Sequence, residues 1–394
     1  MPGRIAFVPP RYGAGVVGGS ESLSREIAIG LAARGWDVEI LTTCAVDHYT
    51  WANELPPGVT REDGLVVRRF EMVHHWSRIT TEVQLAIEAK KPSTLENQLN
   101  WLSGRFAVPD LFLHLLVHGA EYDHVVFSPY LFWTTTVCMP LVVERAVVIP
   151  CLHDEEYARL DVVRPVLRDP QKVWFLSEPE HEVAHRLGPV AEHHVVTGAG
   201  IDPPSSYDPD GFRKKFGISR PFALYAGRRE ADKGWDWLLS TFADASRTGG
   251  LDLDLVTMGV GKVVVPPELS GRVVDLGFLS DQDRNDALSA AAVYLQPSKM
   301  ESFSRSVMEA WLAGTPVLAT ADGEVVAWHC KRSGGGLTFH DAQGLASGLK
   351  TICGSTNTAE TMASKGRDYV LREYSWSVVL DRMEAELESP AWQR

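Results

Sequence analysis

The same order of segments occurs twice in this chain: an apolar run, an amphipathic helical pattern and a second apolar run. The segments span residues 4–10, 20–34 and 38–43 in the first copy, and 221–227, 234–245 and 253–258 in the second. This order is typical of a βαβ unit, in which the two strands are parallel and the crossover is right-handed. The sequence therefore predicts an α/β protein with two Rossmann-like domains, each built on a parallel sheet.

A segment rich in glycine, proline and aspartate separates the two copies. Residues 198–212 have the composition of an interdomain linker. Because 394 residues exceed what one hydrophobic core usually serves, we expect two domains, at 1–197 and 213–374. The remaining residues, 375–394, are expected to form a C-terminal helix that packs back toward the N-terminal domain.

Further short apolar runs predict additional strands. They lie at residues 66–70, 124–128, 146–151 and 173–176, and at 273–276, 293–296 and 317–319. Residues 72–120 look mainly helical. Ligands of open parallel sheets bind beyond the carboxyl ends of the strands, so we expect the ligand site in a cleft between the two domains.

Composition narrows the function classes. Hydrophobic residues make up 45% of the chain and charged residues 23%, as in ordinary globular proteins. The net charge of −13 disfavours nucleic-acid binding, which needs a basic surface. The five cysteines are scattered without CxxC spacing, so neither a disulfide framework nor a zinc site is expected from them.

No apolar run is long enough to cross a membrane, and the first residues lack a signal-peptide pattern, which predicts a cytoplasmic protein. A firm peripheral membrane contact would need a basic amphipathic face. None is evident in the N-terminal half, so only a weak contact is kept as an option, and the oligomeric state is left open.

Gly13, Gly15 and Gly18 match the GxGxxG dinucleotide fingerprint between a strand and a helix. The fingerprint also requires an acidic residue near the end of the second strand, and residues 41–44 offer none. NAD binding, a purely structural turn and a loop that lines the substrate site are three interpretations. We favour the third, in which Gly18 and Gly19 let backbone amides approach a phosphate or a sugar.

Residues 296–317 combine a strand, a loop and a helix with two glutamates, Glu301 and Glu309. Glu301 lies in the loop after the strand, whereas Ser306 and Glu309 are spaced like a capping box at the entry turn of the helix. If the segment is helical throughout, the two glutamates lie roughly 12 Å apart. That distance suits two hydroxyl-rich parts of one ligand joined by an anion, as in a nucleotide sugar.

Cations follow the first strand of the second copy. Arg228 and Lys233 precede a helix and can converge on a diphosphate, although two solvated surface cations are the plainer alternative. His153 follows the run at 146–151 and is expected at the carboxyl end of that strand, although a single histidine is often structural. No second histidine has metal-ligand spacing with it, and His193 and His194 are expected in a loop, so no metal site is predicted.

Together these motifs resemble family 4 of the retaining glycosyltransferases, which have the GT-B architecture of two Rossmann-like domains facing across a cleft. The resemblance rests on residues 18–21, His153, 198–202, 227–228, 233–234, 258–261, 277–278, Glu301, 309–310 and 314–317. It covers most of the chain. Its most specific parts are the Arg228 and Lys233 pair and the two glutamates with the residues that follow them.

The resemblance implies a role for each matching position. Glu309 would hold the ribose hydroxyls of the nucleotide, Glu301 the hydroxyls of the donor sugar, and Arg228 and Lys233 the diphosphate. His153 would line the reaction centre, and Gly19 would let its loop close over the phosphates. Backbone amides would hold sugar or phosphate oxygens at Ser302, Phe303 and Ser304.

The implied reaction moves a hexosyl group from a nucleoside-diphosphate sugar, UDP- or GDP-linked, to a hydroxyl acceptor with retention and without a metal or other cofactor. The acceptor, which is a glycan, a lipid-linked saccharide or a small molecule, would bind the N-terminal domain. Ser302 and Ser304 stand where many members have glycine, which changes the contacts near the donor sugar. Two alternatives therefore stay open: a sugar-nucleotide epimerase and a catalytically silent protein that binds a sugar nucleotide or a glycan.

Overall fold

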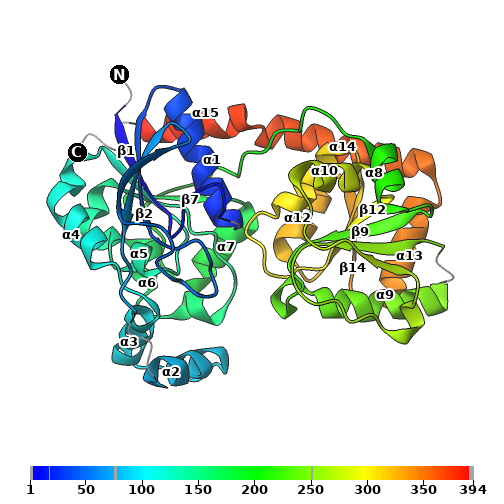
Figure 1. Ribbon diagram of the computed structural model, residues 1–394, viewed down its shortest axis with the longest axis horizontal. Coiled ribbons are helices and arrows are strands. Elements are labelled where there is room, and N and C mark those ends of the chain that lie inside the picture. Colours follow the sequence, from blue (N-terminus) through cyan, green and yellow to red (C-terminus); the bar gives the residue numbers. More distant parts are fainter. Residues whose placement is uncertain (1–2, 17, 75–77, 250–251, 390–394) are drawn as a thin grey trace. The chain divides into compact units, whose positions relative to one another are not determined.

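The computed structural model describes residues 3–16, 18–74, 78–249 and 252–389. It divides into two compact units (Figure 1). Unit 1 comprises residues 1–200 and 379–394, and unit 2 comprises residues 201–378. Among the described residues, no helix is long and apolar enough to span a bilayer.

Unit 1 is built on an eight-stranded sheet in the order β3-β4-β2-β1-β5-β6-β7-β8. Its strands are β1 (Arg4–Val8), β2 (Asp37–Thr43), β3 (Gly58–Glu62), β4 (Leu65–Phe70), β5 (His124–Phe127), β6 (Ala146–Val148), β7 (Lys172–Phe175) and β8 (His193–Val196). Neighbouring strands are parallel except β3 and β4, which form an antiparallel hairpin. The central strands are apolar along their length because both faces of the sheet are covered, and nearly every side chain of β1 and β5 is buried.

Helices of unit 1 connect these strands. These α-helices are α1 (Gly19–Ala33), α2 (Arg78–Glu88), α3 (Leu95–Arg105), α4 (Pro109–His118), α5 (Trp133–Thr136), α6 (Arg164–Arg168) and α7 (Glu178–Leu187). The last helix, α15 (Trp376–Leu387), begins at the end of unit 2 and belongs to unit 1 from Val379 on. Three short 3₁₀ helices are η1 (Gly119–Glu121), η2 (Met139–Arg145) and η3 (Glu156–Arg159). Within unit 1, α2 and α3 pack against each other at one end (Figure 1).

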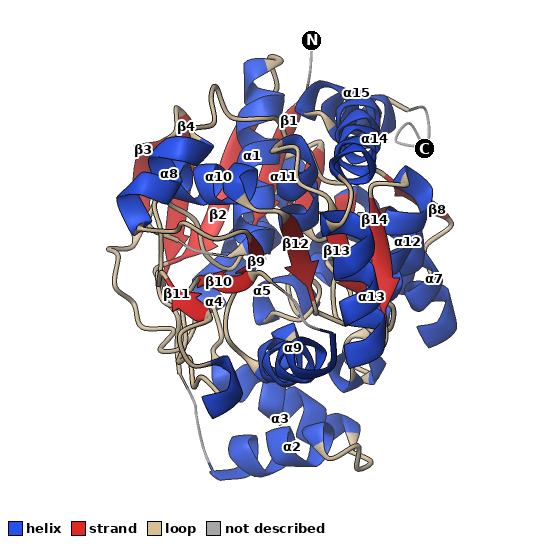
Figure 2. Cartoon of the chain, turned by 90° about the vertical axis from the view of Figure 1, so that its right-hand side faces the viewer, coloured by secondary structure: helices blue, strands red, loops and turns tan. Residues whose placement is uncertain are grey.

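Unit 2 is built on a six-stranded, fully parallel sheet in the order β11-β10-β9-β12-β13-β14. Its strands are β9 (Phe222–Ala226), β10 (Asp254–Met258), β11 (Val273–Asp275), β12 (Val293–Gln296), β13 (Val317–Thr320) and β14 (Gly336–Phe339). Figure 2 shows β12, β13 and β14 side by side with helices around them. The α-helices are α8 (Pro209–Phe216), α9 (Trp235–Gly249), α10 (Asp281–Ala290), α11 (Arg305–Leu312), α12 (Glu324–Ser333), α13 (Ala342–Cys353) and α14 (Thr356–Tyr374), with 3₁₀ helices η4 (Ala231–Lys233) and η5 (Pro267–Leu269).

The predicted α/β class with two parallel sheets is confirmed, but three strands were not predicted. They are β3, β8 and β14. The prediction of a loop at His193 and His194 is wrong, because both residues belong to β8 and pair with β7. The β3–β4 hairpin had a usable signal, since Asp63 and Gly64 at its turn have φ of 53° and 81°, as the Asp-Gly pair of a tight hairpin turn requires.

Strand order reverses once in each sheet. The reversal lies between β1 and β5 in unit 1 and between β9 and β12 in unit 2. At such a point the loops that leave two neighbouring strands diverge to opposite faces of the sheet, and the gap between them is the usual ligand site of an open α/β sheet. Each unit therefore places one pair of loops at a predicted ligand site.

Candidate functional site

In unit 2, the predicted site residues lie on the loops that leave β9 and β12 and on the helix α11. Arg228 and Lys233 follow β9, and Glu301 follows β12. Glu309 lies within α11. The order of the strands thus brings residues from two distant parts of the sequence to one edge of the sheet, at its reversal point.

The loop after β9 is anchored to the loop after β10. The backbone N–H of Gly227 donates to the Met258 carbonyl at 3.1 Å, and that of Arg229 donates to the Val260 carbonyl at 2.9 Å. Gly259 has φ of 129°, and a Cβ there would lie 2.1 Å from the Gly227 carbonyl oxygen. Only glycine allows the two loops to approach this closely.

Two adjacent arginines of this loop have different surroundings. The buried Arg229 guanidinium donates to the carbonyls of Gly259 and Gly261 at 2.6 and 3.2 Å and pairs with Asp275. The Arg228 side chain is 39% exposed, and its guanidinium lies 2.7 Å from the Glu230 carboxylate. Arg229 therefore holds the loop together, whereas Arg228 is open to solvent and available to an anionic ligand.

Lys233 and Glu301 form an ion pair between the two loops. The Lys233 Nζ lies 2.9 Å from Glu301 Oε1, and their side chains are 25% and 17% exposed. The approach depends on Gly234, which has φ of 70° and where a Cβ would lie 2.6 Å from the Pro297 carbonyl oxygen. A cation and a carboxylate, both accessible, thus lie together at the reversal point of the sheet.

Glu309 pairs with a residue that sequence reasoning missed. Its Oε2 lies 3.1 Å from Nη1 of Arg284 on α10. The predicted capping box of Ser306 and Glu309 is wrong, because α11 begins at Arg305 and its N-cap is Ser304. Glu301 precedes the helix, so the continuous helix on which the estimate of the glutamate separation depended is not present.

The loop after β12 is held by the side chain of Gln296, the last residue of that strand. Its Nε2 donates to Ser304 Oγ at 2.8 Å and to Ser306 Oγ at 3.3 Å, and its Oε1 accepts from the Ser298 amide at 3.2 Å. The side-chain amide of Gln296 thereby links the first residues of the loop to its last residues. A polar residue at the end of an apolar strand was the only signal for this role.

Phe303 and Ser304 immediately precede α11 and have different roles. Ser304 has φ of 67°, in the left-handed region that favours glycine. The side chain of Phe303 is buried, with its ring edge-on to those of His329 and Tyr374. Phe303 therefore offers a ligand only its backbone, and its ring belongs to the core.

Tyr225 supports the same loop from β9. Its hydroxyl donates to the Arg228 carbonyl at 2.6 Å. Burial, followed by the nearby Glu301 carboxylate, raises the pKa of Tyr225. The phenol therefore stays neutral at physiological pH and acts as a fixed hydrogen-bond donor beneath Arg228.

In unit 1, Gly18 and Gly19 lie at the start of α1, on the loop that leaves β1. A Cβ at Gly18 would lie 2.2 Å from Glu21 Oε2, whereas a Cβ at Gly19 would meet nothing within 4 Å. Glu21 is buried and pairs with Arg11, whose Nη1 also donates to the Val46 carbonyl at 2.7 Å. Gly18 is thus needed to accommodate this buried ion pair, which was not predicted, while Gly19 leaves open space.

His153 lies in the loop after β6, next to a residue that the buried Glu180 anchors. Its Nδ1 lies 3.7 Å from Glu155 Oε1, and its side chain is 29% exposed. Glu180, on the first turn of α7, accepts from the amides of Leu152 and Leu176, each at 2.5 Å. Glu180 therefore ties the loop that carries His153 to the end of β7, another role that spacing in the sequence did not indicate.

Residues 220–354, about a third of the chain, match the model of a family described as glycosyl transferases group 1. The chain is 25% identical over 408 residues to D-inositol 3-phosphate glycosyltransferase of Jonesia denitrificans, covering 92% of this chain and 89% of that protein. It is 30% identical over 140 residues to 2-deoxystreptamine glucosyltransferase of Streptomyces kanamyceticus, covering 30% of this chain. The chain spans only 36% of the length of that protein and 48% of a lipopolysaccharide core glycosyltransferase of Rhizobium meliloti.

Solved structures share the whole fold. Sucrose-phosphate synthase of Thermosynechococcus elongatus has a TM-score of 0.73 at 20% identity and covers 98% of each chain. The Anabaena protein HepE, in complex with UDP and glucose, has a TM-score of 0.70 at 17% identity, over 98% of this chain and 100% of that one. These similarities establish the GT-B fold.

Proposed function

We propose that this chain transfers a hexosyl group from a nucleoside-diphosphate sugar to a hydroxyl acceptor with retention. Its residues 220–354 match the group 1 glycosyltransferases, and its fold is GT-B. The observation that carries the proposal is the accessible Lys233–Glu301 pair at the reversal point of the unit 2 sheet. A cation for a diphosphate and a carboxylate for sugar hydroxyls are the two groups that such a donor requires.

Donor binding would replace the internal partners of these side chains. A diphosphate would take the place of Glu301 beside Lys233 and of Glu230 beside Arg228, since both cations are accessible. Glu301 would then accept hydrogen bonds from the sugar, and Glu309 from the ribose while sharing Arg284. The backbone amides at Ser302 to Ser304 would complete the site.

The proposed reaction needs no carboxylate nucleophile. The bond from the anomeric carbon to the diphosphate oxygen breaks, and the acceptor oxygen bonds to the same face of that carbon. The acceptor proton moves to the departing diphosphate. The protein would contribute positioning and charge stabilisation of the leaving group by Arg228 and Lys233, without a metal ion. His153 would line the reaction centre.

The first donors to test are UDP sugars, because HepE, which shares the fold, was solved with UDP and glucose. GDP sugars are the second choice. We propose that the acceptor carries a hydroxyl group and binds unit 1. A glycan, a lipid-linked saccharide and a small molecule are the three acceptor classes to screen.

The test combines donor binding and turnover. Thermal unfolding with UDP, GDP, ADP and dTDP and their sugar conjugates should show stabilisation by one nucleotide series, and Glu309→Ala should abolish it. Released nucleoside diphosphate is then measured with an acceptor panel, with and without EDTA. Lys233→Ala should lower kcat/KM by about 10²- to 10³-fold. Lys350→Ala, which removes a cation from the last turn of α13, is the matched control and should leave kcat/KM unchanged.

The outcomes separate the proposal from its alternatives. Binding of a nucleotide without release of diphosphate for any acceptor would favour the catalytically silent protein. Conversion of the sugar nucleotide without any acceptor would favour the epimerase. A full rate for Lys233→Ala would remove Lys233 from the site. A rate that is lost in EDTA and restored by Mg²⁺ would contradict the absence of a metal from the mechanism.

A further inference from the structure

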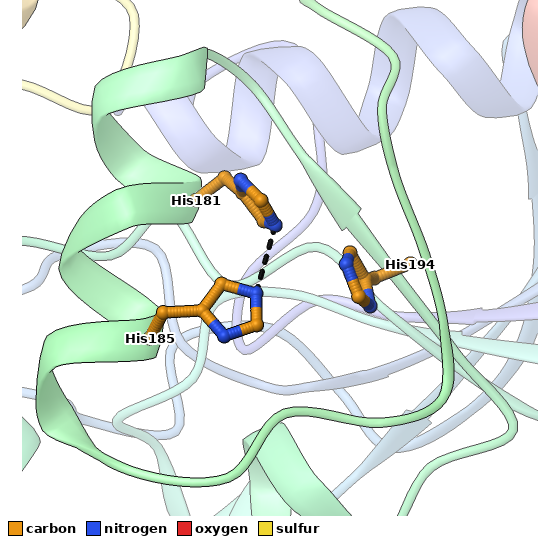
Figure 3. Close-up of side chains that lie close together, drawn as sticks. All are labelled: His181, His185 and His194. Carbon is orange, nitrogen blue, oxygen red and sulfur yellow. Dashed lines mark hydrogen bonds between the residues drawn. The ribbon is translucent and has the colours of Figure 1, made fainter.

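Three histidines of unit 1 converge outside the site described above. His181 and His185 come from α7 and His194 from β8, and their side chains point toward one another (Figure 3). One ring nitrogen of each lies within 4.8 Å of the others. The Nε2 atoms of His181 and His185 are 2.9 Å apart.

Secondary structure explains why the three side chains meet. Residues four apart on a helix share a face, so His181 and His185 project from the same side of α7. After α7 the chain returns along β8, which pairs with β7 in a register that sets His194 opposite Val173. Successive residues of a strand point to opposite faces, so the adjacent His193 is directed away from the cluster.

The chemistry of the rings fits metal ligands. His194 Nδ1 lies 2.8 Å from the Ala191 carbonyl oxygen, a contact that requires a proton on Nδ1 and leaves the Nε2 lone pair free. Burial, together with the neighbouring imidazoles of His185 and His194, lowers the pKa of His181 and favours its neutral, metal-binding form.

The geometry of the rings agrees with this chemistry. The rings of His181 and His185 are nearly perpendicular, at 86°, with their Nε2 atoms facing each other. Ligand atoms around a tetrahedral zinc ion are separated by roughly 3.3 Å, given zinc–nitrogen bonds of about 2.0–2.1 Å. The 2.9 Å between the two Nε2 atoms and the 4.8 Å span of the whole cluster bracket this value.

We propose that His181, His185 and His194 form a binding site for a divalent transition-metal ion, with Zn²⁺ as the principal candidate and water in the fourth position. Three imidazoles suit Zn²⁺, Cu²⁺, Ni²⁺ and Co²⁺, and do not suit Mg²⁺ or Ca²⁺. The ion would link α7 to the edge strand β8. It would thereby fix the helix whose first turn carries Glu180, the partner of the Leu152 amide.

Metal binding to the intact, tag-free chain tests this site. Isothermal titration with Zn²⁺ should show one ion per chain, and Co²⁺ should give the intense visible absorption of a tetrahedral complex. His185→Gln and His194→Gln should each weaken Zn²⁺ binding by about tenfold or more. His193→Gln, on the same strand but the opposite face, is the matched control and should bind like the wild type. Mg²⁺ should produce no heat.

Several results would overturn the site. Equal Zn²⁺ affinity for the wild type and His194→Gln would show that β8 contributes no ligand. Equal weakening by His193→Gln would show nonspecific binding, and an absence of binding would show that the rings only pack together. Affinity that does not fall as the pH drops below about 6.5 would exclude imidazole ligands, which must be neutral to bind.

Discussion

Ser304 illustrates how one residue combines a backbone cost with a side-chain contact. Its φ of 67° costs a non-glycine residue roughly 1–2 kcal/mol, whereas its Oγ accepts a hydrogen bond from Gln296. Such a bond contributes about 1 kcal/mol. We therefore expect Ser304→Gly to change the free energy of unfolding by less than about 1 kcal/mol, because the two effects offset each other.

Ser304→Ala separates the two effects, since alanine keeps the backbone cost and loses the hydrogen bond. It should destabilise the protein by about 1–2 kcal/mol relative to Ser304→Gly. Urea unfolding of both variants and the wild type measures the difference. If the two variants were equally stable, the left-handed backbone would not determine which residue the loop accepts at position 304.

Helix α7 has a pH-dependent anchor at its first turn. Burial raises the pKa of Glu180 to about 8, against the opposing effect of the amides of Leu176, Leu152 and Ser177. Between the unfolded pKa of about 4.5 and the folded value, unfolding releases a proton. The contribution of Glu180 to the free energy of unfolding is therefore complete below about pH 4.5 and is lost as the pH rises toward 8.

Glu180→Gln removes this titration and isolates its contribution. The free energy of unfolding of the wild type, relative to Glu180→Gln, should fall by roughly 1.4 kcal/mol per pH unit between about pH 5 and 8. Denaturant unfolding across that range measures the two slopes. Parallel curves would mean that the Leu152 and Leu176 amides keep the carboxylate ionised. His340→Gln, an exposed change in unit 2, should retain the wild-type slope in this comparison.

At the scale of the whole molecule, unit 1 is completed by residues from the far end of the chain. Lys172 on β7 has a side chain only 2% exposed, and its Nζ lies 3.1 Å from the Glu386 carboxylate and 2.7 Å from Ser389 Oγ. The Trp36 Nε1 donates to Glu384 at 3.0 Å. The buried ammonium group of Lys172 thus has its partners more than 200 positions away in the sequence.

A chain that ends at Val378 should lose stability in unit 1. The truncation removes the Glu386 and Ser389 partners of the Lys172 ammonium and uncovers the surface of unit 1 against which the buried face of α15 packs. An ammonium that stays buried without partners costs about 3–5 kcal/mol. Lys172→Met in the truncated chain should recover about 3 kcal/mol of that loss. Thermal and urea unfolding of the four combinations measure this. Equal losses with and without Lys172→Met would show that the ammonium is solvated in the truncated chain.

Particular elements show what local sequence could predict. The alternation of apolar runs and amphipathic segments predicted both parallel sheets, because strands buried on two faces must be apolar throughout. It missed β3, β8 and β14, whose exposed or polar residues reflect their places at the edges of the sheets. An edge strand is covered on fewer sides, so its composition resembles that of a loop.

The sequence alone determined the class of the fold and the segments that end at the carboxyl edges of the sheets, since these follow from local periodicity and from the glycines that turns require. Only the tertiary structure decided the partners: Glu309 with Arg284, and Lys233 with Glu301 across 68 positions. It also brought His194 to His181 and His185. Such contacts depend on strand order, register and helix packing, which many residues determine together and which no local pattern encodes.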